Sequence, residues 1–184
     1  MVLKNCLLPV LIIGVILINS CKKISDAAPT ITTGTFTASS TAFTNNGTFP
    51  KLYTCDSAGI SPKISWSNVP TGTTNFAIVM HHVPPTPPNH VYMILYNIPA
   101  TVTNIPDAVS GIGLFGINSV NGGQSYTPPC SQGPGAKLYI ITVYALSSAP
   151  VFTVPHSQVT RDILLAAIAN KTLAAFELNV TYTR

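Results

Sequence analysis

Three histidines lie close together in the middle of the chain and could in principle bind a metal ion. His81 and His82 are consecutive, and His90 follows shortly after them. Consecutive side chains of a strand point to opposite faces, so His81 and His82 cannot share one metal unless the strand ends between them. His82 could face His90 across a hairpin, but the neighbouring sequence offers no Asp, Glu or Cys to complete a tetrahedral set. We therefore expect no metal and no cofactor here.

The acidic side chains are too few for an obvious general acid and base pair. The 184-residue chain has five Asp and Glu residues against nine Lys and Arg residues. It contains no Gly-rich phosphate loop and no Gly-x-Ser-x-Gly nucleophile elbow, and no Ser-His-Asp triad shows a local signature. We therefore expect a protein that is not an enzyme.

The charge balance is mildly basic and does not indicate nucleic acid as a partner. Without Lys4 the chain keeps eight of its nine basic side chains and all five acidic ones, a net charge of about +3. Arg161 and Arg184 are the only arginines, and no basic stripe or nucleic-acid motif is present.

The first residues have the pattern of a secretory leader. Residues 1–20 contain one charged side chain, Lys4, followed by an apolar run that is too short for a mature membrane span. The end of this leader, Ile18-Asn19-Ser20-Cys21, resembles the lipobox of bacterial lipoproteins, in which the cysteine is acylated. The alternatives are an ordinary cleaved signal peptide and an uncleaved anchor.

This pattern divides the chain into three parts. We expect a lipoprotein-type signal peptide at residues 1–20, a small and polar tether at 21–33, and one domain at 34–184. The protein would then be lipid-anchored in a bacterial cell envelope, on the periplasmic or surface side, with the membrane as a partner through its anchor.

Cysteine usage agrees with an exported domain. Cys6 belongs to the leader and Cys21 would carry lipid, which leaves Cys55 and Cys130 in the domain. Two cysteines in an exported domain predict a disulfide between them. The alternative is a pair of unpaired buried thiols, and two cysteines alone do not make a zinc site.

Short β-type runs separated by prolines and glycines predict a mainly β domain. The run Asn75–His82 is apolar on both faces until His81, as is typical of a central strand covered on both sides. The full set of candidate strands is Thr35–Ser39, Lys63–Trp66, Asn75–His82, Val91–Ile98, Lys137–Leu146 and Phe176–Thr183.

One helix is expected near the C-terminal end. Its apolar residues recur at helical spacing, Ser157 or Thr160 can cap its first turn, and Asn170 can take the left-handed conformation that often ends a helix. The periodic residues are Val159, Ile163, Leu164, Ala167 and Ile168.

Several ordered motifs together resemble the bacterial branch of the phosphatidylethanolamine-binding protein family, also called the Raf kinase inhibitor protein family. The resemblance extends over about residues 34 to 184. It is carried by Tyr53-Thr54-Cys55-Asp56, Ser61-Pro62, Trp66, Pro70, Thr73, Ala77, Tyr96-Asn97-Ile98-Pro99-Ala100, Asn118-Ser119, Pro129-Cys130, Tyr139, Tyr144-Ala145-Leu146, Leu173-Ala174, Glu177-Leu178, Thr181-Tyr182 and Arg184.

The resemblance implies a large antiparallel sheet packed on a smaller sheet, with few helices. It also implies a pocket at one end of the sheet that binds the phosphate of a phospholipid head group or a similar small anion. A second implied function is protein interaction, as an inhibitor of a kinase or a protease. The implied ligand-binding positions are His82, His90, Tyr92, Pro128, Pro129, Lys137 and Tyr139.

Three of these positions depart from the family pattern. His82 replaces a carboxylate, while Tyr92 and Lys137 each replace a histidine. The changes remove a negative charge and add a positive one, so the pocket should favour anions more strongly, and increasingly so as pH falls through the range where histidine is protonated. The alternative is a degenerate pocket that binds nothing.

Overall fold

The structure is a computed structural model that describes residues 35–184. The predicted signal peptide at 1–20, the predicted acylation site Cys21 and the predicted tether at 21–33 lie outside the described residues. Among residues 35–184 no helix has both the length and the apolar character needed to cross a membrane.

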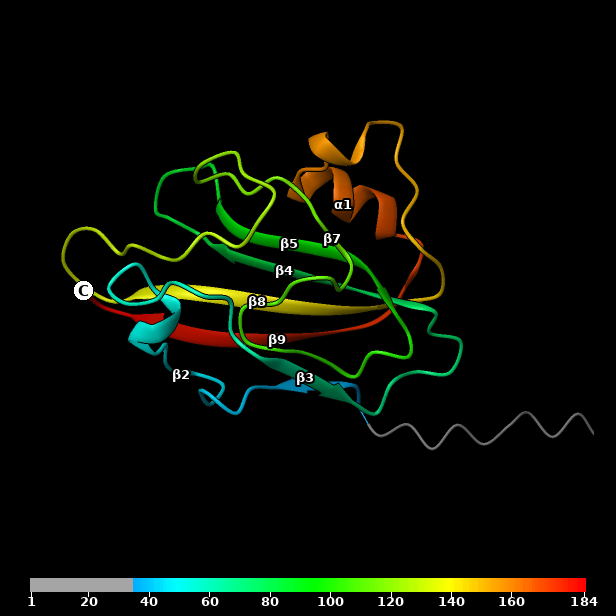
Figure 1. Cartoon of the computed structure of the whole chain (residues 1–184), viewed down its shortest axis with the longest axis horizontal. Coiled ribbons are helices and arrows are strands. Elements are labelled where there is room, and N and C mark those ends of the chain that lie inside the picture. The colour runs from blue at the N-terminus through cyan, green and yellow to red at the C-terminus, as the bar shows by residue number, and fades with distance from the viewer. Residues whose placement is uncertain (1–34) are drawn as a thin grey trace, which may run out of the picture. The chain divides into compact units, whose positions relative to one another are not determined.

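The larger of two sheets has six strands in the spatial order β2-β9-β8-β4-β5-β7. Its pairs are antiparallel except for the parallel pair of β2 with β9. Figure 1 shows β9, β8, β4 and β5 side by side across the molecule. The strands are β2 (Gly47–Thr48), β4 (Asn75–His82), β5 (His90–Pro99), β7 (Leu114–Phe115), β8 (Lys137–Leu146) and β9 (Thr172–Tyr182).

The smaller sheet has three antiparallel strands in the order β1-β3-β6. They are β1 (Thr37–Ser39), β3 (Ile64–Ser67) and β6 (Asn104–Ile105). Two short 3-10 helices, η1 (Lys51–Tyr53) and η2 (His156–Gln158), and one α-helix, α1 (Arg161–Ile168), complete the described elements. This mainly β architecture with two sheets and one α-helix confirms the predicted fold class.

Strand β4 divides the core because its alternate side chains point to opposite faces. Phe76, Ile78 and Met80 join the cluster shared with the small sheet, whereas Ala77 and Val79 join the cluster that contains the buried residues of α1. Both faces of the strand are therefore covered, as its continuous apolar sequence predicted.

An aromatic group joins the two sheets. The ring of Phe76 on β4 lies 4.8 Å from that of Trp66 on β3 and 6.3 Å from that of Phe36 before β1, measured between centroids. All three side chains are buried, so this contact fixes the small sheet on the large one.

The helix begins at the second of the two predicted caps. The Thr160 side chain accepts a hydrogen bond from the backbone N–H of Ile163, at 3.4 Å. Asn170 does not take a left-handed conformation, because the last helical carbonyl is already satisfied. The carbonyl of Ile168 accepts from the N–H of Lys171 at 2.9 Å and from the hydroxyl of Thr172 at 3.0 Å.

The predicted bounds of β4 and β8 are confirmed, and the other strand boundaries differ from the predicted ones by a few residues. The largest difference is at β9, which begins at Thr172 instead of Phe176. Ala174 and Ala175 did not indicate a strand because alanine is a weak strand former, yet both pair with β8, and the ladder continues past a register shift at Leu173 to Thr172. The two-residue strands β2, β6 and β7 are too short to show any alternation.

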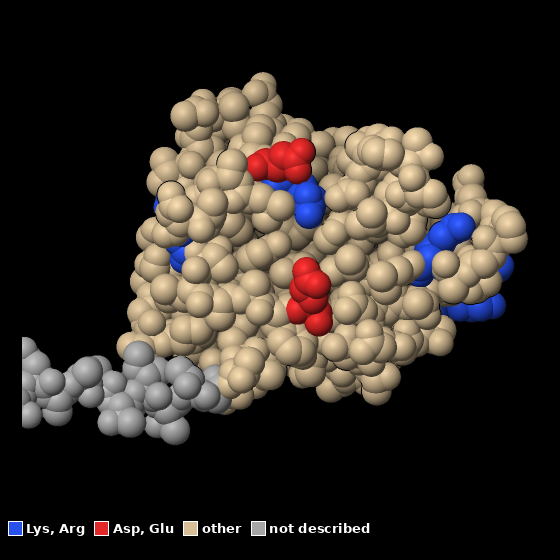
Figure 2. Space-filling model, turned by 180° about the vertical axis from the view of Figure 1, so that it is seen from behind, with Lys and Arg blue, Asp and Glu red and all other residues tan. Residues whose placement is uncertain are grey.

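The surface carries few charges. Figure 2 shows one face on which Asp, Glu, Lys and Arg side chains are sparse and most atoms belong to uncharged residues. This agrees with a composition of only 8% charged residues.

His81, on the helix side of β4, should make stability depend on pH. Burial, followed by the nearby Arg161 and His82, lowers the pKa of His81 from 6.5 to about 4. Between these values the unfolded chain binds a proton that the folded chain does not, so stability falls as pH falls from 6.5 to 4. At 1.36 kcal/mol per unit, the His81 contribution lost is about 2 to 3 kcal/mol.

Urea denaturation at pH 7 and pH 4.5 measures this loss. We expect His81→Gln to lose less stability than the wild type between the two pH values. His156→Gln, at an exposed position on η2, is the matched control and should follow the wild type. If the free energy of unfolding of His81→Gln fell as much as that of the wild type between the two pH values, His81 would not be the group responsible.

Candidate ligand-binding site

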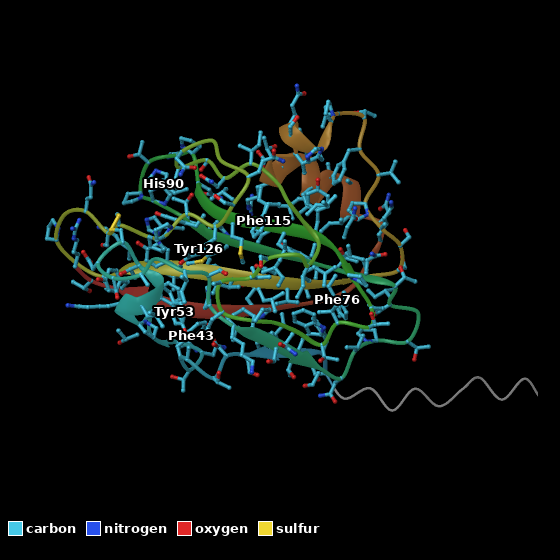
Figure 3. The ribbon with its side chains drawn as sticks, viewed as in Figure 1. Phe43, Tyr53, Phe76, His90, Phe115 and Tyr126 are labelled. Carbon is cyan, nitrogen blue, oxygen red and sulfur yellow. A yellow bond between two sulfur atoms is a disulfide. The ribbon has the colours of Figure 1, made fainter. Side chains whose placement is uncertain are left out.

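A pocket of about 610 Å³ opens where the last residue of β4 meets the first residues of β5 and β8. This volume lies within the range of roughly 300–1,000 Å³ that is usual for small-molecule sites. Figure 3 shows His90 at the same end of the molecule as Tyr126 and Tyr53, and Phe76 at the other end. The lining residues are His82, Pro84, Pro85, His90, Tyr92, Ser119, Val120, Thr127, Pro128, Cys130, Ser131, Gln132, Lys137 and Tyr139.

Strand register brings three aromatic or imidazole side chains together. His82 is paired with His90 on one neighbouring strand and with Tyr139 on the other. The His82 ring lies 6.1 Å from the His90 ring and 5.6 Å from the Tyr139 ring, measured between centroids. Residues from three strands thus meet at one sheet end although they are far apart in the sequence.

A bulge in β5 places Tyr92 in the pocket. The register passes from Met80 opposite Met93 to His81 opposite Val91, which leaves Tyr92 as an extra residue. Its ring packs edge to face on that of Tyr139, with centroids 5.3 Å apart. The free carbonyl of Tyr92 accepts a hydrogen bond at 2.9 Å from the N–H of Thr127, which holds the start of the 127–132 loop against the strand.

A disulfide holds the other end of this loop. Cys55 and Cys130 are bonded, as the sequence predicted, with their Cα atoms 5.4 Å apart. The N–H of Cys55 also donates to the carbonyl of Pro129 at 3.1 Å. Gly59 lets the neighbouring turn approach closely, because it has a φ of +64° and a Cβ there would lie 3.1 Å from Pro128.

Two residues of the pocket wall carry buried hydroxyl groups. Ser131 and Thr127 are 3% and 8% exposed, and neither side-chain oxygen has a partner with good hydrogen-bond geometry among the described residues, although the Ser131 hydroxyl lies close enough to Tyr139 to lower the pKa of that phenol. Buried polar groups are normally satisfied, so two such hydroxyls beside one pocket indicate a place for a ligand or for water.

The phenols of the pocket stay neutral donors at physiological pH. Burial raises the pKa of Tyr92, and a hydrogen bond with Tyr139 opposes this in part. Burial also raises the pKa of Tyr139, the neighbouring Tyr92 adds to the effect, and the nearby Ser131 hydroxyl opposes it. Each phenol therefore keeps its proton at physiological pH.

The cationic side of the pocket is formed by Lys137 and the imidazoles. The Lys137 ammonium donates to the carbonyl of Pro134 at 3.3 Å and has two further protons to donate. Nδ1 of His82 lies 2.7 Å from the carbonyl oxygen of Leu138. Because a carbonyl only accepts, Nδ1 is the protonated nitrogen, and Nε2 can donate to an anion once the ring is charged. The pH dependence expected of this residue stays a prediction.

The comparisons with known proteins agree with this architecture. The family model described as phosphatidylethanolamine-binding protein matches residues 39–183. The chain belongs to the phosphatidylethanolamine-binding protein family. Its mainly β fold with two sheets can therefore be compared with the folds of other family members.

Several bacterial relatives cover most of the domain. The UPF0098 protein of Chlamydia muridarum is 33% identical over 150 residues, which are 78% of this chain and 95% of the relative. The UPF0098 protein of Chlamydia trachomatis is 32% identical over 152 residues, which are 79% of this chain and 97% of the relative.

Two crystal structures share the fold. The phosphatidylethanolamine-binding protein homolog CT736 of Chlamydia trachomatis has a TM-score of 0.73 and 28% identity, and the match covers 81% of this chain and 97% of CT736. YbcL of E. coli has a TM-score of 0.73 and 22% identity, over 81% of this chain and 98% of YbcL. The second likeness is one of fold alone.

In the present chain, six of the seven predicted ligand-binding residues line the pocket. The exception is Pro129, which is buried and whose carbonyl bonds to the Cys55 N–H, so its side chain is not part of the wall. Sequence reasoning missed Thr127 and Ser131, although both flank the predicted Pro128–Cys130 segment. It also missed Ser119, Val120 and Gln132.

The histidine cluster separates as the strand pattern suggested. His82 and His90 pair across the hairpin, whereas the neighbouring His81 is buried and does not line the pocket. Among residues 35–184 no group of three or more His, Cys, Asp or Glu side chains is close enough to hold a metal ion.

Proposed function

We propose that this domain binds a small anionic ligand of the phosphate type in the pocket at the end of β4, β5 and β8. In this proposal the domain has no enzymatic activity. It is exported and held at a bacterial membrane by lipid on Cys21, which the leader pattern and the sequence Ser20-Cys21 support.

The observation that carries the proposal is the set of hydroxyl donors in the pocket wall. Ser131 and Thr127 place buried hydroxyl groups beside the pocket, and Tyr92 and Tyr139 add phenols kept neutral by burial. A phosphate has several acceptor oxygens, so it can engage several such donors at once. Hydrogen bonds to a charged acceptor are also stronger than neutral ones.

The electrostatic character of the wall supports an anion as well. Lys137 supplies a positive charge at the rim, and His82 and His90 can each add one when protonated. About half of the remaining lining residues are proline, valine or tyrosine, which lowers the local polarity and strengthens these interactions.

Calorimetric titration of the full chain in detergent micelles with inorganic phosphate at pH 7 tests the proposal. We expect saturable binding, and about a tenfold or greater loss of affinity in Ser131→Ala, because a hydrogen bond to a charged group contributes about 1.5–3 kcal/mol. Ser110→Ala is the matched control, since Ser110 is exposed and does not line the pocket.

Two results would count against this function. Equal affinities of Ser131→Ala and the wild type would remove the hydroxyl from the site. Absence of binding for phosphate and for sulfate in a folded wild-type protein would indicate a pocket that does not take anions.

A second candidate, a protein-interaction or inhibitor module, has one observation in its favour. Val120 lines the pocket and is 47% exposed, and Val83, next to the lining Pro84, is 56% exposed. A contiguous apolar patch around a concave site is typical of protein interfaces, and these two valines are the residues from which such a patch could be built. A kinase or a protease would then be the class of partner, and failure of every anion to bind would favour this candidate.

A further inference from the structure

The part of the pocket wall that residues 35–184 form contains no carboxylate. Its fourteen lining residues include one lysine and two histidines but no Asp or Glu. A ligand that carries a positive group next to its phosphate therefore finds no negative partner in this wall.

The acidic side chains elsewhere in the domain are also committed to other contacts or lie away from the pocket. Asp56 has the most direct covalent link to the pocket wall. It follows Cys55, and Cys130, the disulfide partner of Cys55, lines the pocket. Asp56 accepts a hydrogen bond from the Tyr182 hydroxyl and pairs with the Arg184 guanidinium at 2.9 Å. Its charge is thus neutralised within the described residues before any ligand binds.

The other described acids serve the scaffold. Asp107 accepts from the backbone N–H of Lys63 at 2.6 Å, and Asp162 pairs with Arg161 at 3.4 Å. Glu177 lies within β9 and pairs in register with Thr142 of β8, away from the sheet end that holds the pocket. None of the three lines the pocket.

The aromatic rings are only partly available in place of the missing carboxylate. An ammonium can bind over the face of a tyrosine, but Tyr92 and Tyr139 pack edge to face, and Tyr139 also stacks on Phe49 with centroids 6.4 Å apart. The Lys137 ammonium also lies in the wall and repels a second cation.

We propose, building on the phosphate-binding function above, that this pocket selects phosphate groups without an attached ammonium and discriminates against phosphoethanolamine-type head groups. The ligand is then a simple phosphate monoester or an anionic phospholipid head group. Specificity then has two sources. The hydrogen-bond donors of the wall favour the phosphate anion, while the charge of Lys137 and the lack of a carboxylate disfavour the attached ammonium of the zwitterion.

Propyl phosphate and phosphoethanolamine form a matched pair of probes, because they differ mainly in a terminal methyl group against an ammonium. We expect the full chain in detergent to bind propyl phosphate about tenfold more tightly than phosphoethanolamine. Equal or tighter binding of phosphoethanolamine would overturn the inference while leaving phosphate binding intact. Absence of binding for both probes and for inorganic phosphate would contradict the proposed function itself.

A gain of function gives a sharper test. His82 is half-buried beside His90 and Tyr139, so His82→Asp adds a carboxylate to the wall without opening the core. We expect this variant to reduce or reverse the preference for propyl phosphate, whereas His156→Asp, at an exposed position outside the pocket, keeps it. If His82→Asp does not fold, Lys137→Met should still reduce the ratio of the affinities for propyl phosphate and phosphoethanolamine. An unchanged ratio in a folded Lys137→Met variant contradicts the inference.

A third comparison identifies the source of the phosphate group. Soluble dihexanoyl phosphatidate that binds more tightly than propyl phosphate assigns the site to an anionic lipid head group. Equal affinity assigns it to the phosphate group alone, and either result is compatible with discrimination against the ammonium.

Discussion

Replacement of both Cys55 and Cys130 by alanine is expected to lower the free energy of unfolding by about 4 kcal/mol. The disulfide joins residues separated by 75 positions, and the chain-entropy model assigns a stabilisation of about this size to a loop of that length. Urea denaturation measures the loss directly. Wild-type protein kept in a reducing agent is the matched control, because it should lose a similar amount without any substitution.

The same double variant should lose phosphate affinity as well as stability. Cys130 lines the pocket, and its bond to Cys55 holds the loop that carries Thr127 and Ser131. A variant with unchanged unfolding energy and unchanged affinity would show that the hydrogen bonds of Thr127 and Cys55 hold this loop without the covalent bond.

Replacement of Cys21 by serine is expected to abolish acylation of the protein and to release it from the membrane. Several acyl chains on one residue give stable membrane attachment, whereas loss of all of them leaves only the domain and its tether. Labelling of growing bacteria with radioactive palmitate should mark the wild type and not Cys21→Ser. Fractionation should then find the wild type with membranes and the variant in the soluble fraction.

Two other outcomes have distinct meanings. Wild-type protein that is unlabelled and already soluble, with residues 1–20 removed, would indicate an ordinary signal peptide. Wild-type protein that is unlabelled, membrane-bound and still carries residues 1–20 would indicate an uncleaved anchor. Ser57→Ala, a change of a small exposed residue within the domain, is a control that should affect neither labelling nor fractionation.

The long strands and the helix could be predicted because each carries a repeated pattern. Apolar residues fill both faces of β4, and helical spacing combined with Thr160 marks the start of α1. The shortest strands could not be found, since two residues show no period, and the ladder at Ala174 and Ala175 depends on tertiary pairing and not on local preference.

The candidate site was predictable in outline and not in its chemistry. Family resemblance pointed to the segments that contain His82, Tyr92 and Lys137, and the structure brings these residues together. The buried hydroxyls of Thr127 and Ser131 were not predictable, because serine and threonine are common in loops and only their burial makes them notable. The bulge that turns Tyr92 into the pocket is likewise visible only in the pairing register.

The contact between Asp56 and Arg184 has a practical consequence for protein production. Arg184 and Tyr182 both contact the carboxylate of Asp56, which follows Cys55 of the disulfide. An affinity tag fused after Arg184 would therefore begin next to the residues that hold the pocket loop. A purification handle is better placed in an exposed loop remote from the pocket, such as the segment around Val151, which is 77% exposed.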